Sequence, residues 1–163
     1  MFLLAASFLN TPHPPPPSQE KCGATTLLDI ATLTGACMVA LGPSVAGLLT
    51  PSEGLAEQIR QAARAAGERV WRLPLEEEYF EGLKSPVADL RNTAGRLGGT
   101  ITAALFLKQF VKEGVEWAHL DVAGPVWSEK QGLPTGFGAA LLAEWALAQA
   151  REAGAAAPVV NGK

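Results

Sequence analysis

One apolar stretch, from Thr25 to Cys37, constrains the fold of this 163-residue chain more than any other. It begins with apolar and β-branched residues, which are typical of a strand buried on both faces of a parallel sheet. It ends in the small and polar residues 32–36, which suit the carboxyl end of a strand, where open α/β sheets bind ligands. Gly35 and Ala36 would leave the backbone accessible to a substrate, although a simple turn explains Gly35 equally well. The stretch therefore predicts an α/β fold with a candidate ligand contact at this strand end.

The next part of the chain contains the signals of a strand, a helix and a second strand. Residues 45–49 suit a short buried strand, and residues 70–75 are extended because the residue before Pro74 avoids the helical region. Between them, Ser52 is a good N-cap, Glu53 suits the first helical turn, and Gly67 is a plausible C-cap. This order predicts a β-α-β crossover that covers one face of a parallel sheet.

The second half of the chain predicts a helix, a buried strand and another helix. The helix over 100–112 has small residues that allow close approach to the sheet, and Phe110 is expected to fill space beside it. Residues 117–122 suit a second buried strand, and residues 139–150 suit an apolar helix that covers the sheet. The fold class is therefore α/β, with a mostly parallel sheet covered by helices.

The two ends of the chain differ in composition from the rest. Residues 1–19 include four consecutive prolines, which cannot join a helix or a central strand. The apolar run over 2–9 has no Lys or Arg before it, so a signal peptide fits poorly. We expect a disordered, Pro-rich tail over 1–19, a folded body over 20–150, and a flexible tail over 151–163.

Composition narrows the possible partners and compartments. A net charge of −3 provides no reason to expect nucleic acid or an anionic membrane as a partner. No apolar run is long enough to cross a bilayer. The two cysteines, Cys22 and Cys37, are too few for a disulfide scaffold or a zinc knuckle, which favours reduced thiols in a cytoplasm or a plastid stroma.

Three groups of polar residues are further candidates for a site. Backbone N–H groups over 98–101, with Arg96, could cradle an anion, but a glycine turn beside a surface arginine explains them as well. The acidic residues 76–78 point about 100° apart on a helix, which favours a solvated face over a metal site. His119 and Asp121 share one strand face, a spacing that suits a metal pair, but core hydrogen bonding is favoured.

Six short motifs follow one another in the body of the chain. They are DIATLTGAC (29–37), GERVWRLPL (67–75), KSPVADL (84–90), GGTITAALFL (98–107), WAHLDVAG (117–124) and TGFG (135–138). In residue type and order they resemble the leucine aminopeptidase (cytosol aminopeptidase) family, from about Thr25 to about Leu147. Residues 124–127 resemble the plant and cyanobacterial branch of that family.

The resemblance implies the C-terminal part of a three-layer α/β/α, zinc-peptidase-like catalytic domain. Members of the family are homo-hexamers that release N-terminal residues from peptides, using water activated between two divalent ions, Mn or Zn. Their metal ligands come largely from an Asn-Thr-Asp-Ala-Glu-Gly-Arg motif and a Lys/Asp cluster, both upstream of the strand that here ends at Thr32. Neither is in this chain. Residues 92–96 match the Asn-Thr-Asp-Ala-Glu-Gly-Arg motif only in part and contain no carboxylate. We therefore expect neither a metal ligand nor a catalytic residue here.

The resemblance also implies that this chain carries the wall of the substrate pocket. Thr32, Leu33 and Gly35 match positions that hold the peptide, whereas Ala123 and Val126 match positions that line the pocket for the N-terminal side chain. We expect a fragment with little or no activity on its own, located in the cytoplasm or, alternatively, the plastid stroma. One alternative is a non-catalytic isoform that associates with full-length subunits. Another is an unrelated module that binds a phosphorylated ligand at residues 98–100.

Overall fold

The computed structural model describes residues 2–6 and 23–155, and five of its strands form one sheet in the order β1-β2-β5-β3-β4. The strands are β1 (Phe2–Ala6), β2 (Thr26–Ala31), β3 (Ala46–Leu49), β4 (Val70–Arg72) and β5 (Glu116–Asp121). All neighbouring strands run parallel except β3 and β5. The mostly parallel sheet expected from the sequence is confirmed.

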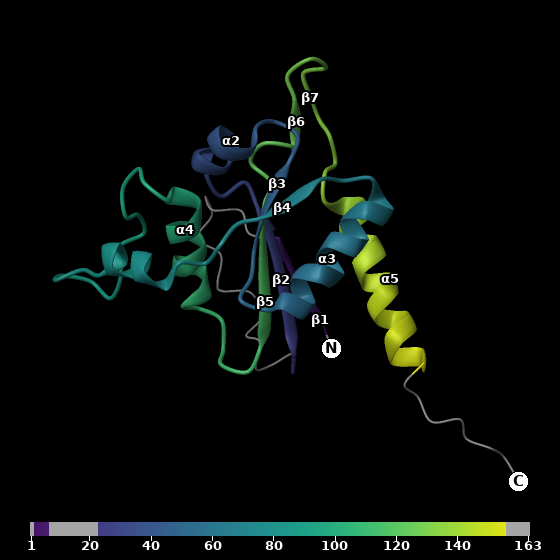
Figure 1. The fold of residues 1–163 in the computed structure, drawn as a ribbon, viewed down its shortest axis with the longest axis horizontal. Helices are drawn as coiled ribbons and strands as arrows, with labels where there is room; N and C mark the ends of the chain where they lie inside the picture. Colours follow the sequence, from purple (N-terminus) through teal and green to yellow (C-terminus); the bar gives the residue numbers. More distant parts are fainter. Residues whose placement is uncertain (1, 7–22, 156–163) are drawn as a thin grey trace, which may run out of the picture.

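Helices cover both faces of this sheet, so the three-layer α/β/α architecture is confirmed. Figure 1 shows α3 and α5 on one side of the strands and α4 on the other. The helices are α2 (Gly35–Leu41), α3 (Glu53–Ala66), α4 (Gly99–Lys108) and α5 (Ala139–Ala155). Because β2 and β5 are covered on both faces, Leu28, Ala118 and Leu120 have no exposed surface.

The helix α3 follows the local signals in its sequence. The Ser52 hydroxyl accepts the N–H of Leu55 at 3.2 Å, and Gly67 ends the helix in the left-handed conformation with φ of 70°. Its apolar residues recur at helical spacing and are buried against β3, β5 and α5: Leu55, Ala56, Ile59, Ala62 and Ala63. With β3 parallel to β4, the predicted β-α-β crossover is confirmed.

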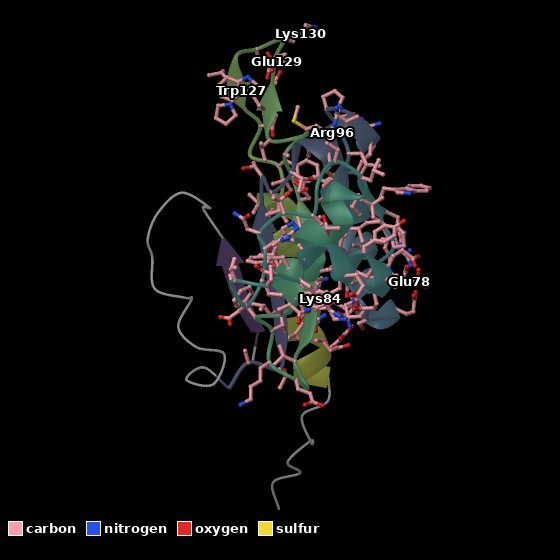
Figure 2. All side chains as sticks on the ribbon, turned by 90° about the vertical axis from the view of Figure 1, so that its left-hand side faces the viewer. Glu78, Lys84, Arg96, Trp127, Glu129 and Lys130 are labelled. Atoms are coloured by element: carbon pink, nitrogen blue, oxygen red, sulfur yellow. The ribbon has the colours of Figure 1, made fainter. Side chains whose placement is uncertain are left out.

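Two smaller elements lie outside the layers. The 3₁₀ helix η1 (Glu77–Leu83) precedes the long loop to α4, and its acidic residues are exposed, as a solvated face requires. The strands β6 (Trp127–Ser128) and β7 (Leu133–Pro134) form a hairpin that projects beyond the sheet, with Glu129 and Lys130 at its tip and Trp127 nearer its base (Figure 2). No helix in residues 2–6 and 23–155 is long and apolar enough to cross a membrane.

The structure differs from the sequence predictions near both ends of the chain. Phe2–Ala6, predicted to be part of a disordered tail, forms β1, because the edge of β2 has backbone groups that a parallel partner satisfies. The helix α5 continues to Ala155, five residues into the predicted C-terminal tail, because alanine favours helix. Residues 7–19 and 156–163 of the predicted tails lie outside the described residues.

The helix α4 is shorter than predicted. It ends at Lys108, and the next residues make 3₁₀-type bonds, from the Gln109 N–H to Phe106 and from the Phe110 N–H to Leu107. Phe110 is 66% exposed and does not fill the core, so that prediction was wrong.

Candidate functional site

The candidate site is formed by the two loops that follow the central strands β2 and β5. These strands are parallel, and their last residues, Ala31 and Asp121, are in register. The loops over 32–34 and 122–126 therefore leave the sheet side by side at its carboxyl edge, the usual place for ligands in open α/β sheets.

The carboxylate of Asp121 bonds to both loops. The Asp121 side chain is fully buried, and its Oδ1 accepts N–H groups from Leu33 at 3.1 Å, Thr34 at 3.4 Å and Ala123 at 3.2 Å. Its Oδ2 accepts the Thr34 hydroxyl at 2.7 Å. A carboxylate only accepts hydrogen bonds, so each of these groups is a donor.

The Thr34 hydroxyl uses its whole bonding capacity in this network. It gives its proton to Asp121, and it accepts the Cys37 N–H at 3.0 Å as the N-cap of α2. It also lies 3.0 Å from the Thr100 hydroxyl. Because Thr34 has only one proton to donate, Thr100 is the donor in that contact. The first loop is thereby joined to α2, to β5 and to the first turn of α4.

Cys37 lies close to the same loops, and its thiol is unreactive. Its thiol is buried and donates to the Asp121 carbonyl oxygen at 3.7 Å. Burial, followed by the nearby Asp121 charge, raises the pKa of Cys37 from 9.0 to about 11. The thiol therefore stays protonated at neutral pH, a form that neither attacks a carbonyl nor binds a metal.

The five predicted wall residues occupy different environments. Thr32 and Gly35 are exposed, whereas Leu33, Ala123 and Val126 are half-buried. Asp121 brings the backbones of Leu33 and Ala123 together. Val126 instead packs against the core cluster formed with α3 and α5.

A close backbone contact supports the second loop. A Cβ on Gly124 would lie 2.4 Å from the carbonyl oxygen of Gly42, at the end of α2. Only glycine permits this approach, so the small residue after β5 is required by the packing of the second loop against the end of α2.

His119 and Asp121 make separate sets of hydrogen bonds in the core. The His119 Nδ1 lies 2.5 Å from the Asp29 carboxylate, which also accepts the Trp117 indole N–H at 2.8 Å. The predicted core hydrogen bonding of His119 and Asp121 is confirmed. The His119 Nε2 is buried and has no partner in the part of the chain that the structure describes.

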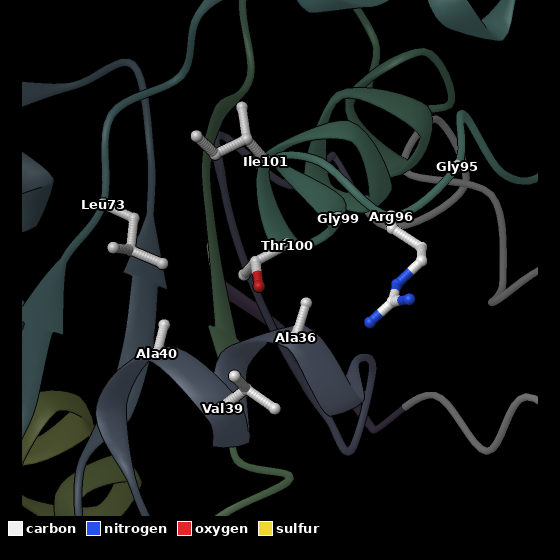
Figure 3. Close-up of a pocket in the computed structure, with 10 residues that line it drawn as sticks. Ala36, Val39, Ala40, Leu73, Gly95, Arg96, Gly99, Thr100 and Ile101 are labelled. Carbon is white, nitrogen blue, oxygen red and sulfur yellow. The ribbon is translucent and has the colours of Figure 1, made fainter.

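A separate pocket of about 530 Å³ lies between α2 and the start of α4. Figure 3 shows Arg96 at one edge of it and Leu73 at the opposite edge. It is lined by Ala36, Val39, Ala40, Leu73, Gly95, Arg96, Gly98, Gly99, Thr100 and Ile101, and by none of the five predicted wall residues.

The local structure explains why residue 98, at the rim of this pocket, is a glycine. Gly98 has φ of 61°, and a Cβ there would lie 2.9 Å from the Tyr79 ring. Arg96 is exposed, and the Thr100 hydroxyl is bonded to Thr34. These contacts agree with a glycine turn beside a surface arginine.

Sequence reasoning missed the roles of Thr34 and Asp121. A threonine three residues before Cys37 is a recognisable N-cap signal. The bonds from Asp121 span 87 and 88 residues of sequence, and no local pattern predicts them.

Comparisons with known proteins agree with the sequence motifs. Residues 17–143 match the model of the cytosol aminopeptidase family, catalytic domain. The chain is 59% identical over 125 residues to the chloroplastic leucine aminopeptidase 2 of Oryza sativa subsp. japonica, covering 77% of this chain and 21% of that protein. It is 60% identical over 142 residues to a probable cytosol aminopeptidase of Synechococcus sp. (strain JA-2-3B'a(2-13)), covering 84% of this chain and 27% of the relative.

A solved structure agrees as well. A mutant of tomato leucine aminopeptidase superposes with a TM-score of 0.77 at 57% identity, covering 78% of this chain and 25% of that one. The chain thus spans about a quarter of the length of these relatives. The predicted resemblance to plant and cyanobacterial members is confirmed, and the chain belongs to the cytosol aminopeptidase family.

Proposed function

We propose that this chain is the C-terminal part of the catalytic domain of a leucyl aminopeptidase, which releases N-terminal residues, preferably apolar ones, from peptides. The observation that carries the proposal is the pair of small-residue loops tied together at the carboxyl ends of β2 and β5. The family match, and relatives named leucine aminopeptidase at about 60% identity, support it.

In this proposal the two loops form one wall of the substrate pocket. The Asp121 carboxylate accepts the N–H groups of Leu33 and Thr34, so these groups are not free to donate hydrogen bonds to a peptide. Gly35 is the first residue of α2, and its N–H therefore has no partner within the helix. The exposed Thr32 and Gly35 would meet the peptide backbone, and Leu33 and Ala123 would meet its first side chain. Val126 would hold the second loop on the core and contribute the far end of the wall.

The metal ions of the proposed enzyme require ligands that the described residues of this chain do not bring together. Within residues 2–6 and 23–155, no three His, Cys, Asp or Glu side chains come together as a metal site. The buried carboxylates of Asp29 and Asp121 already accept hydrogen bonds from protein groups. We therefore propose that two divalent ions, Mn or Zn, are held by other parts of the enzyme, and that this chain alone is inactive.

The names of the relatives support a proposal for the location of the enzyme, and the family resemblance alone supports one for its assembly. The cyanobacterial relative is named a cytosol aminopeptidase, and the rice relative is named chloroplastic. We propose the cytoplasm, with the plastid stroma as the alternative, and a homo-hexamer as the assembled state.

Two measurements with one substrate test the proposal. The purified 163-residue chain is assayed on leucine amide with added Mn²⁺ or Zn²⁺, and we expect no turnover above the metal blank. A chimera is assayed in parallel, in which residues 25–147 replace the matching segment of tomato leucine aminopeptidase, and we expect metal-dependent turnover. Turnover by the isolated chain would overturn its proposed inactivity, and an inactive but folded chimera would overturn the proposed substrate wall.

Association with full-length subunits is a second candidate function. Exposed apolar side chains beside the pocket favour it, since Val39 is 90% exposed and Leu97 is 89% exposed. Co-expression with a full-length relative, followed by size-exclusion chromatography, tests it. We expect co-elution in that case, and an unassociated chain would contradict it.

A further inference from the structure

We propose that Asp121 is a positioning residue of the substrate pocket, which sets the separation of the two wall loops and thereby the size of the N-terminal side chain that fits. The inference rests on the function proposed above for these loops. It adds that their spacing is controlled by a buried carboxylate that never touches the substrate.

The first reason is that one oxygen atom bonds to both loops. Asp121 Oδ1 accepts the N–H of Leu33 at 3.1 Å and the N–H of Ala123 at 3.2 Å. Two nitrogen atoms bonded to one oxygen have little freedom to move apart. The separation between the backbones of Leu33 and Ala123, one in each wall loop, therefore depends on this atom.

The second reason is that the other oxygen anchors the first loop to its surroundings. Oδ2 accepts the Thr34 hydroxyl, which in turn accepts the Thr100 hydroxyl from α4 and the Cys37 N–H from α2. A movement of the first loop would break several bonds at once, because the network shares the Thr34 hydroxyl.

The third reason is that a core position does not otherwise need a charge. Asp121 has no exposed surface, and an apolar side chain of similar size is often at least as stable at a buried site. Its strand neighbours Leu120 and Val122 are apolar and buried. The carboxylate at this position is thus explained by the four donors that it organises.

The same sheet contains a matched control. Asp29 is also buried, at 8% exposure, and also accepts bonds from buried partners, the His119 ring and the Trp117 indole. Its bonds reach neither wall loop. Loss of the Asp29 charge therefore disturbs the core to a comparable degree and leaves the separation of the two wall loops unchanged.

The test uses the active chimera with tomato leucine aminopeptidase and compares leucine amide with alanine amide. For Asp121→Asn we expect kcat/KM for leucine amide to fall about tenfold or more, since small misplacements in a site have large effects. We expect a smaller fall for alanine amide, with most of the difference in KM. For Asp29→Asn we expect the ratio of kcat/KM for the two substrates to stay within about twofold of the parent.

A second pair of variants covers the case in which Asp121→Asn does not fold. Thr34→Val removes one donor to Asp121, and Thr34→Ser keeps it; we expect the first to lower the leucine-to-alanine ratio and the second to restore it. An unchanged ratio in Asp121→Asn, or in Thr34→Val if the former is unfolded, would overturn the inference. An equal change in Asp29→Asn would do so too, because it would reveal a general effect of core damage. An inactive parent chimera would instead count against the proposed function.

Discussion

The hydroxyl of Thr34 donates to the carboxylate of Asp121 at 2.7 Å, although the two residues are 87 positions apart in the sequence. Thr34 follows the first central strand, and Asp121 ends the second. Each residue also bonds to a further part of the proposed site: Thr34 to the starts of α2 and α4, and Asp121 to Ala123. This contact therefore connects the two loops with β5, α2 and α4.

Replacement of Thr34 by valine should destabilise the chain. Valine has nearly the shape of threonine, but it cannot cap α2 and leaves Asp121 Oδ2 without its donor. Loss of an N-cap costs about 1 kcal/mol, and a buried unsatisfied acceptor costs about 1–3 kcal/mol. We expect the free energy of unfolding in urea to fall by about 2–4 kcal/mol. Thr34→Ser should lose much less, and equal losses in the two variants would contradict the role of the hydroxyl.

The thiol of Cys37 should resist alkylation until the protein unfolds. Burial and the Asp121 charge raise its pKa to about 11, so the reactive thiolate is scarce at pH 8. In a Cys22→Ser background, iodoacetamide should label Cys37 slowly in buffer and quickly in urea. Rapid labelling of the native chain at pH 8 would contradict the buried environment.

The same shift predicts a loss of stability at alkaline pH. The folded chain holds the Cys37 proton more tightly than the unfolded chain, whose thiol has a pKa near the ordinary 9.0. The stabilisation is therefore fully present below pH 9 and is lost as the pH rises through about 11. Urea unfolding at pH 8 to 11 should show a steeper decline for Cys22→Ser than for the same variant with Cys37→Ala.

Alanine at position 124 should displace the second wall loop from the end of α2. Its Cβ would meet the Gly42 carbonyl oxygen at 2.4 Å, which forces the backbone to shift. We expect a loss of about 1–3 kcal/mol in the free energy of unfolding, as for other overpacked sites. Gly54→Ala is the control, since its nearest neighbouring atom would be 3.9 Å away within α3. An equal effect of the two substitutions would show that the contact with Gly42 is unimportant.

The ion pair between Glu53 and Arg72 should be visible in a carboxyl titration. The Arg72 guanidinium donates to the Glu53 carboxylate at 2.5 Å and attracts its charge, which holds the pKa of Glu53 below its ordinary 4.5. The contribution of this pair is present above pH 4.5 and is lost as the pH falls through the lowered pKa. NMR titration of Glu53 should show a midpoint below 4.5 that moves upward in Arg72→Met. An unchanged midpoint would contradict the pair.

Local signals explain which parts of the fold were predictable. Ser52, Gly67 and the apolar spacing between them define α3, because capping and helical periodicity act within a few residues. The buried strands β3 and β5 were predicted for the same reason, from short apolar runs of strand length. The strand β1 was not, because it is stabilised by its pairing with β2, a strand far along the chain.

The candidate site also combines features that the sequence predicts with features that depend on the tertiary structure. The sequence by itself determined the α/β class, the family, and the small residues at Thr32, Gly35 and Ala123 that end the two strands. Only the tertiary structure decided that Asp121 bonds to Leu33 and Ala123 together, and that His119 pairs with Asp29 in the core. The physical reason is that residue type and spacing act locally, whereas a hydrogen-bond partner depends on which strands the sheet places side by side.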